Sequence, residues 1–222
     1  MNFESFGYRG HFVYTAPMIF QNQNENLLII ATPYGESADL ENSLAEFLNE
    51  FESQSEDLDA TSPYPKLTCL SSEENLLFTS VQFLNDNIYT NYNRETFNLG
   101  CDFFCVYKKG KNLYTVQIGW PLSILHKDNK NRPLASEYAF MPKDQSAAPY
   151  IPTSLLGLES SVNVKIQHID VDDKSEILLL KSNESPDSLL SLYPNSLDSI
   201  ANVFATESPE QGFWLGKISF DD

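Results

Sequence analysis

The chain has 222 residues, of which 41% are hydrophobic and 13% aromatic, a composition that excludes an intrinsically disordered protein. Its 14 Lys and Arg residues against 31 Asp and Glu residues give a formal net charge of −17. Such a surface repels the phosphates of nucleic acids and of anionic lipids. We therefore expect a single domain over residues 1–222, with no nucleic acid partner.

Neither export nor membrane insertion is indicated by the sequence. Met1–His11 lacks the basic start and apolar core of a signal peptide. The longest apolar runs, Leu27–Ala31 and Ile177–Leu180, are too short to cross a bilayer. An odd and low number of cysteines indicates free thiols in a reducing compartment. They are Cys69, Cys101 and Cys105. We expect a cytoplasmic protein without a membrane partner.

The first part of the chain predicts strands and then a long helix. Leu27–Ala31 is a short apolar run typical of a strand, and the Asn-rich Gln21–Asn26 before it has the composition of a hairpin loop. Apolar residues then recur at helical spacing, with acidic residues on the opposite face. They are Leu40, Leu44, Phe47, Leu48 and Phe51.

A second long helix is expected after a loop at Ser53–Pro65, which contains two prolines. Ser71 and Glu74 have the spacing of a capping box, in which each side chain bonds the backbone of the other residue. The apolar stripe behind this helix start consists of Leu77, Val81, Leu84 and Ile88. The pattern predicts a helix that packs along one face.

The middle of the chain predicts strands again. Asp102–Tyr107, Leu113–Ile118 and Leu122–His126 are separated by turn-like residues and indicate a meander. Residues 127–152 are polar and contain four prolines. We interpret them as a long surface excursion within the domain, because they have too few apolar residues for a core of their own.

The last part of the chain mixes strands with short helices. Val162–His168 alternates, and Glu176–Lys181 is a compact apolar strand. Ser185-Pro186-Asp187 has the residues of a helix start, and Leu189–Phe204 predicts one or two short helices. Phe213–Phe220 predicts a final strand. Strands grouped apart from helices favour an α+β fold with antiparallel sheets.

Four segments that end or begin strands carry recognisable motifs: Leu27–Glu36, Leu99–Gly119, Glu176–Glu184 and Glu210–Phe213. In this order they resemble motifs of the type 2C, metal-dependent Ser/Thr protein phosphatases. The family counterparts are a strand with an Asp-Gly-x-Gly-Gly turn, a Gly-x-Thr strand pair, a Ser-Asp-Gly strand end and an Asp-Asn pair. The resemblance implies a four-layer αββα sandwich of two antiparallel sheets flanked by helices.

The residues that would bind metal in this family are changed here. A binuclear Mg²⁺ or Mn²⁺ site needs clustered carboxylates, because these hard cations take oxygen ligands. By the resemblance, Thr32 and Pro33 replace the Asp and Gly of the first turn, and Asn183 replaces the Asp of Ser-Asp-Gly. Glu210 keeps a charge at the Asp-Asn position, whereas no acid lies near Thr15–Pro17, where the family has Asn-Glu-Asp.

The resemblance therefore implies a pseudophosphatase with no catalytic residue, no metal and no cofactor. Where the family has Gly-Asp-Ser-Arg, this chain has Gly119-Trp120-Pro121-Leu122, and Trp120 is either a core residue or an interface anchor. A domain that keeps this fold without its catalytic residues can still bind other molecules. We therefore expect a regulatory module with a protein partner. A basic partner suits the net charge of −17. The expected binding face is the former site: Thr32, Pro33, Tyr34, Glu36, Trp120, Asn183, Glu184 and Glu210.

Two alternatives stay open. The chain could be a divergent metal-dependent phosphatase with relocated ligands, or a structural subunit of a larger assembly. The candidate relocated ligands are Glu36, Asp39, Asp102, Glu184, Asp187 and Glu210. Each of these acids could equally be a solvated surface residue. The histidines His11, His126 and His168 are isolated in sequence and give no metal signal.

Overall fold

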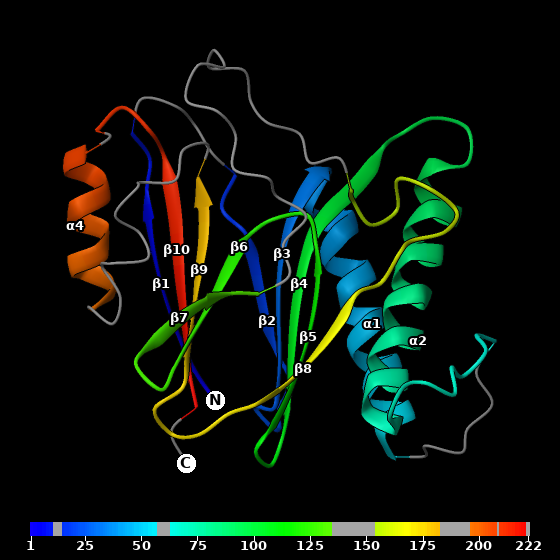
Figure 1. The fold of residues 1–222 in the computed structure, drawn as a ribbon. Coiled ribbons are helices and arrows are strands. Elements are labelled where there is room, and N and C mark those ends of the chain that lie inside the picture. The colour runs from blue at the N-terminus through cyan, green and yellow to red at the C-terminus, as the bar shows by residue number, and fades with distance from the viewer. Residues whose placement is uncertain (11–14, 57–62, 135–153, 183–195, 208, 221–222) are drawn as a thin grey trace. The chain divides into compact units, whose positions relative to one another are not determined.

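The computed structural model describes residues 1–10, 15–56, 63–134, 154–182, 196–207 and 209–220 (Figure 1). The chain forms two compact units. The terminal unit comprises Met1–Ala16, Trp120–Pro152 and Asp170–Asp222, and the central unit comprises Pro17–Gly119 and Thr153–Ile169. Each unit is built on one five-stranded antiparallel sheet.

The central sheet has the strand order β2-β3-β4-β5-β8. Its strands are β2 (Met18–Gln21), β3 (Leu27–Gly35), β4 (Leu99–Lys109), β5 (Asn112–Ile118) and β8 (Ile166–Asp170). The predicted hairpin loop between β2 and β3 is confirmed, and the buried Asn22 organises it. Its side-chain Oδ1 accepts hydrogen bonds from the backbone N–H groups of Asn26 and Leu27, at 3.1 and 3.0 Å.

Two long helices, α1 (Ser37–Glu56) and α2 (Ser72–Ile88), cover one face of this sheet (Figure 1). The predicted apolar stripes form the contact, and Leu40, Leu44 and Phe47 are fully buried against the sheet. The capping box is confirmed: Ser71 Oγ accepts from Glu74 N, and Glu74 Oε2 accepts from Ser71 N. A π-helical turn, η1 (Tyr89–Asn93), continues α2 by five residues.

Two neighbouring hydroxyl groups on α2 are expected to contribute to stability with opposite signs. Ser80 Oγ is buried without a hydrogen-bond partner, whereas Thr79 Oγ1 lies 2.9 Å from Gln54 Oε1 of α1 and 2.9 Å from Asn75 O. Removing an unsatisfied hydroxyl relieves a desolvation cost, so Ser80→Ala should raise the free energy of unfolding by about 1 kcal/mol. Thr79→Ala should lower it by about 1 kcal/mol. Urea denaturation of both variants tests the contrast, and a destabilising Ser80→Ala would contradict it.

The terminal sheet has the strand order β1-β10-β9-β6-β7. Its strands are β1 (Asn2–Tyr8), β10 (Phe213–Ser219), β9 (Glu176–Ser182), β6 (Leu122–Lys127) and β7 (Lys130–Pro133). The helix α4 (Leu197–Glu207) packs on one face of it, beside β1 and β10 (Figure 1). Its buried residues Ile200 and Phe204 join Phe213 and Leu215 in one core.

The sequence-based element order is largely confirmed, with four differences. β6 pairs with β9 and β7, so it does not continue the β4–β5 hairpin as a meander. β7 is a strand within the predicted excursion, since Lys127–Lys130 closes a hairpin. β1 was not predicted, because only Phe3, Phe6 and Tyr8 mark it in a polar stretch. α1 extends to Glu56, into the predicted loop. The expected helix start at 185–187 lies outside the described residues.

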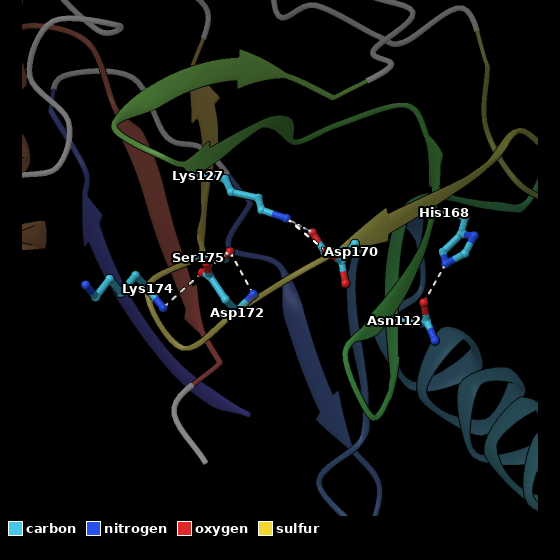
Figure 2. A network of polar contacts seen from close by, with 7 residues as sticks. All are labelled: Asn112, Lys127, His168, Asp170, Asp172, Lys174 and Ser175. Atoms are coloured by element: carbon cyan, nitrogen blue, oxygen red, sulfur yellow. Dashed lines mark hydrogen bonds and ion pairs between the residues drawn. The ribbon is translucent and has the colours of Figure 1, made fainter.

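Polar contacts hold β8 and the turn that follows it (Figure 2). In the central unit, His168 lies 2.9 Å from Asn112 Oδ1 and stacks on the ring of Tyr114. In the terminal unit, Lys127 Nζ donates to the backbone oxygen of Asp170 at 2.7 Å. The hydrogen bond from Ser175 Oγ lowers the pKa of Asp172, whose carboxylate organises the turn before β9. His168 thus has local contacts with two residues of β5.

The predicted α+β class, with two antiparallel sheets and helices on them, is confirmed. Among the described helices, none is long and apolar enough to span a membrane.

Candidate functional site

Three of the predicted site residues, Thr32, Pro33 and Tyr34, lie near the end of β3, shortly before α1 begins. They are part of the strand and do not form a loop after it. Thr32 pairs with Asp102 of β4 and Pro33 pairs with Cys101. Side chains alternate along a strand, and Ala31, Cys101 and Phe103 face the core beneath α1 and α2. Thr32, Tyr34 and Asp102 therefore point to the opposite face of the central sheet.

Asp102 is the chemically unusual residue of this edge. Its carboxylate is fully buried, and its Oδ2 accepts a hydrogen bond of 3.0 Å from the Tyr34 hydroxyl. Tyr34 stands opposite Gly100, so its side chain reaches Asp102 along the diagonal that joins same-face residues on neighbouring strands. The buried carboxylate is thus engaged by a residue of the predicted binding face.

Gly119, the residue after the end of β5, contacts the same Asp102 carboxylate. It has a φ of +73°, and a Cβ placed on it would lie 2.2 Å from Asp102 Oδ1 and 3.0 Å from the carbonyl oxygen of Ser154. Only glycine fits a positive φ at so close an approach. The backbone of Gly119 and the Asp102 carboxylate are therefore packed in direct contact.

The cysteines next to the site give no sign of reactivity. Cys101 and Cys105 are fully buried in the core beneath the helices, and all three cysteines are free. Burial raises the pKa of both buried thiols, and the Asp102 charge adds to the effect at Cys101. A thiol that stays protonated is a poor nucleophile and a poor metal ligand. Cys101 and Cys105 lie on the same face of β4, and that face packs in the core.

The remaining predicted residues lie elsewhere. Glu36 is exposed just after β3, at the start of α1. In the terminal unit, Trp120 packs against the core beneath α4, and Glu210 is exposed in the turn before β10. Asn183 and Glu184 lie outside the described residues. The structure thus groups Thr32, Tyr34 and Asp102, and it places Trp120 as a core-packing residue of its own unit.

The residues of the central-unit edge do not fit a binuclear metal centre. Thr32 offers a neutral hydroxyl, Pro33 is buried, and the Asp102 carboxylate is enclosed and bonded to Tyr34. Such a centre needs several carboxylates around two cations. Among the residues that the structure describes, no three His, Cys, Asp or Glu side chains gather closely enough to hold a metal ion.

Comparisons with known proteins give matches at the level of structure. No family model and no curated protein matches the sequence. The serine/threonine phosphatase PstP/Ppp of Mycobacterium tuberculosis matches 100% of this chain and 99% of its own, with a TM-score of 0.66 and 16% identity. The chain has the type 2C phosphatase fold.

Two further structures support this fold. PppA of Pseudomonas aeruginosa gives a TM-score of 0.68 at 12% identity, with 99% of this chain and 97% of that chain covered. The serine/threonine phosphatase Stp1 of Staphylococcus aureus gives 0.66 at 15% identity, with 99% and 95% covered. The type 2C fold therefore spans the whole chain, as the four motifs suggested.

Sequence reasoning named Asp102 as a candidate relocated ligand but missed its contacts with Tyr34 and Gly119. A signal was present in the sequence: Asp102 is the one charged residue in the apolar run Leu99–Tyr107. A charge inside a buried strand needs a partner, and Tyr34 is placed to be that partner. The cross-strand register that brings them together depends on the folded sheet.

Proposed function

We propose that this chain is a non-catalytic binding or regulatory module built on the type 2C phosphatase scaffold, with another protein as its ligand. The free thiols of its three cysteines support a place in the cytoplasm. Its formal charge of −17 favours a basic partner surface. Fold alone does not assign an activity, so the proposal depends on the site residues.

The observation that carries the proposal is the chemistry and burial of two paired residues, Thr32 of β3 and Asp102 of β4. The position that should supply a metal-bridging carboxylate holds a neutral, buried threonine. The Asp102 carboxylate on the neighbouring strand is fully buried and accepts a hydrogen bond from the Tyr34 hydroxyl. An enclosed carboxylate with a protein partner is poorly placed to hold an ion and a phosphate together.

Tyr34 and Glu36 are the residues through which this edge can meet a partner. Tyr34 is half-buried and Glu36 is exposed, so both can contribute at an interface. Aromatic residues with a fixed hydroxyl are common binding anchors, and an exposed acid at the interface rim favours basic partners. We therefore place the partner over the β3–α1 junction.

Affinity capture followed by measurement with the purified partner tests this placement. The chain would be used to capture proteins from the lysate of its source organism, and the captured protein would be purified and titrated. Glu36→Lys should weaken its binding by about tenfold or more. Glu56→Lys makes the same change at the far end of the 20-residue α1, about 30 Å away, and should leave binding unchanged. Equal affinity of the two variants for the partner would show that the partner does not bind at the β3–α1 junction.

The alternative, a divergent phosphatase with relocated ligands, is favoured by one observation. Asp102 retains a carboxylate directly opposite the position of the lost one. If it binds metal, Mn²⁺-dependent hydrolysis of an aryl phosphate should be present in the wild type and abolished in Asp102→Asn. Turnover with this dependence would favour the enzyme over the binding module.

A further inference from the structure

Phe97 is the most exposed of the large apolar side chains in the described parts of the chain, although its backbone is held between η1 and β4. Half of its surface is exposed. The Asn98 side chain donates to the carbonyl oxygens of Tyr92 and Thr96, at 2.7 and 3.1 Å. Asn93 Oδ1 accepts from the backbone N–H of Asn98 at 2.8 Å. An exposed ring on a held backbone loses little freedom when a ligand binds to it.

The ring of Phe97 takes the place of the side chain that Gly100 lacks. Its Cε2 and Cζ atoms lie 3.1 and 3.2 Å from the position that a Cβ of Gly100 would have. The next residue, Cys101, faces the core beneath α1 and α2, so the missing Cβ would point to the other face of the sheet. The Phe97 ring therefore lies on the face that carries Tyr34 and Asp102.

Tyr34 and Phe97 are neighbours on this face, and we call them the aromatic pair. Tyr34 pairs directly with Gly100 across β3 and β4, and the Cβ positions of such a pair lie about 5 Å apart. The nearest atom of the Phe97 ring is thus within about 8 Å of Tyr34 Cβ. The hydrogen bond of the Tyr34 hydroxyl to Asp102, at 3.0 Å, restrains the second ring.

An exposed carboxylate lies at the same end of the sheet. Gly35, the last residue of β3, pairs with Leu99, the first residue of β4. Glu36 therefore leaves β3 where Phe97 and Asn98 lead into β4, and Glu36 is exposed. The chain thus presents a carboxylate at the end of the sheet that carries the aromatic pair.

The sequence around this end of the sheet contains few positive charges. No Lys or Arg occurs between residues 27 and 65, and Arg94 is the only one between residues 67 and 107. The face of an aromatic ring carries a partial negative charge, so an exposed ring near a carboxylate attracts a cation. Because the proposed ligand is a protein, that cation is one of its basic side chains.

We propose that the aromatic pair binds an arginine side chain of the protein partner, which makes Phe97 a further binding residue. The guanidinium stacks on the Phe97 ring and donates hydrogen bonds to Glu36. Arginine suits these groups better than lysine, because its planar and weakly hydrated cation stacks on aromatic faces and binds a carboxylate with two parallel N–H groups. This inference rests on the proposed binding function and names the chemistry that the partner presents to the β3–α1 junction.

NMR titration of the full chain with short peptides tests the inference. The probes are capped, glycine-flanked peptides that differ only in a central arginine, lysine or citrulline. The arginine peptide should shift the amide resonances of Glu36, Phe97 and Gly100 in a saturable way, and the lysine peptide should bind at least about threefold more weakly. Citrulline has nearly the same shape without the charge and should leave these resonances unchanged. Equal binding of the arginine peptide and either of the other peptides would overturn the proposal.

Substitutions at Phe97 separate stacking of a cation from simple apolar contact. Phe97→Leu keeps an apolar side chain without a π face, so it should weaken binding of the arginine peptide at least about fivefold, whereas Phe97→Trp should keep or strengthen it. Phe6→Leu makes the same change at an exposed ring of β1, in the terminal unit, and should bind the peptide as the wild type does. Wild-type affinity in Phe97→Leu would overturn the proposal.

The protein captured from the lysate distinguishes failure of this inference from failure of the proposed function. Weaker binding of that protein to both Glu36→Lys and Phe97→Leu would support the two together. If Glu36→Lys weakens binding and Phe97→Leu does not, the partner binds at the β3–α1 junction without an arginine on Phe97, and only this inference fails. Wild-type affinity in both variants would overturn the binding site and this inference alike.

Discussion

Gly119→Ala is expected to lower the free energy of unfolding by about 3 kcal/mol or more. Two costs add: a side chain at a φ of +73°, and a methyl group 2.2 Å from Asp102 Oδ1. Urea denaturation gives the difference. A loss below about 1 kcal/mol would show that the Gly119 and Asp102 contact is looser than described.

A double-mutant cycle separates the two costs. Asp102→Ala removes the carboxylate that the new methyl would meet, so in its presence Gly119→Ala should cost less, by about 1 to 3 kcal/mol. The remaining cost comes from the backbone conformation, which the second substitution does not change. Additive losses would contradict direct packing between the two residues. Gly110→Ala is the matched control for positive φ, because a Cβ there meets nothing within 4 Å.

Phe47→Ala is the second change with a large expected effect, a loss of about 3 to 5 kcal/mol in the free energy of unfolding. Phe47 is fully buried, packs edge-to-face on Phe103 with ring centroids 5.7 Å apart, and stacks on Phe51. It is one of the aromatic contacts between α1 and β4, together with that of Phe51 on Tyr107. Helix propensity works in the other direction, since alanine is the better helix former, so the measured loss is slightly smaller than the packing cost of removing the ring.

Phe97→Ala is the control for Phe47→Ala. Phe97 is 50% exposed, so the same truncation there removes little buried surface and should cost less than about 1 kcal/mol. Chemical denaturation of both variants measures the contrast. Similar losses at the two positions would contradict the core as described.

Much of the fold could be predicted from the sequence, because local patterns determine it. The α1 stripe of Leu40, Leu44 and Phe47 and the capping box at Ser71 both fix helices without reference to the rest of the chain. Strand partners could not be predicted in the same way. β6 follows the β4–β5 hairpin in sequence but pairs with β9, a choice made by long-range packing.

The sequence shows which residues of the site differ from the family motif, but it does not show which residues of the site contact one another. Thr32 and Pro33 stand out against a family pattern, so their neutral chemistry could be read from the sequence. The bond between Tyr34 and Asp102 joins residues 68 positions apart, and it exists because the β3–β4 register sets them on one face. The π-helical turn η1 likewise has no simple sequence signature.

Calorimetric titration of the full chain with Mn²⁺, combined with an aryl phosphate assay, tests the central claim most directly. A scaffold that presents Thr32 and an enclosed Asp102 should give no saturable heat up to millimolar Mn²⁺ and no metal-dependent turnover. Two tightly bound ions with accompanying turnover would contradict a non-catalytic role, and would identify the chain as a working phosphatase with relocated ligands.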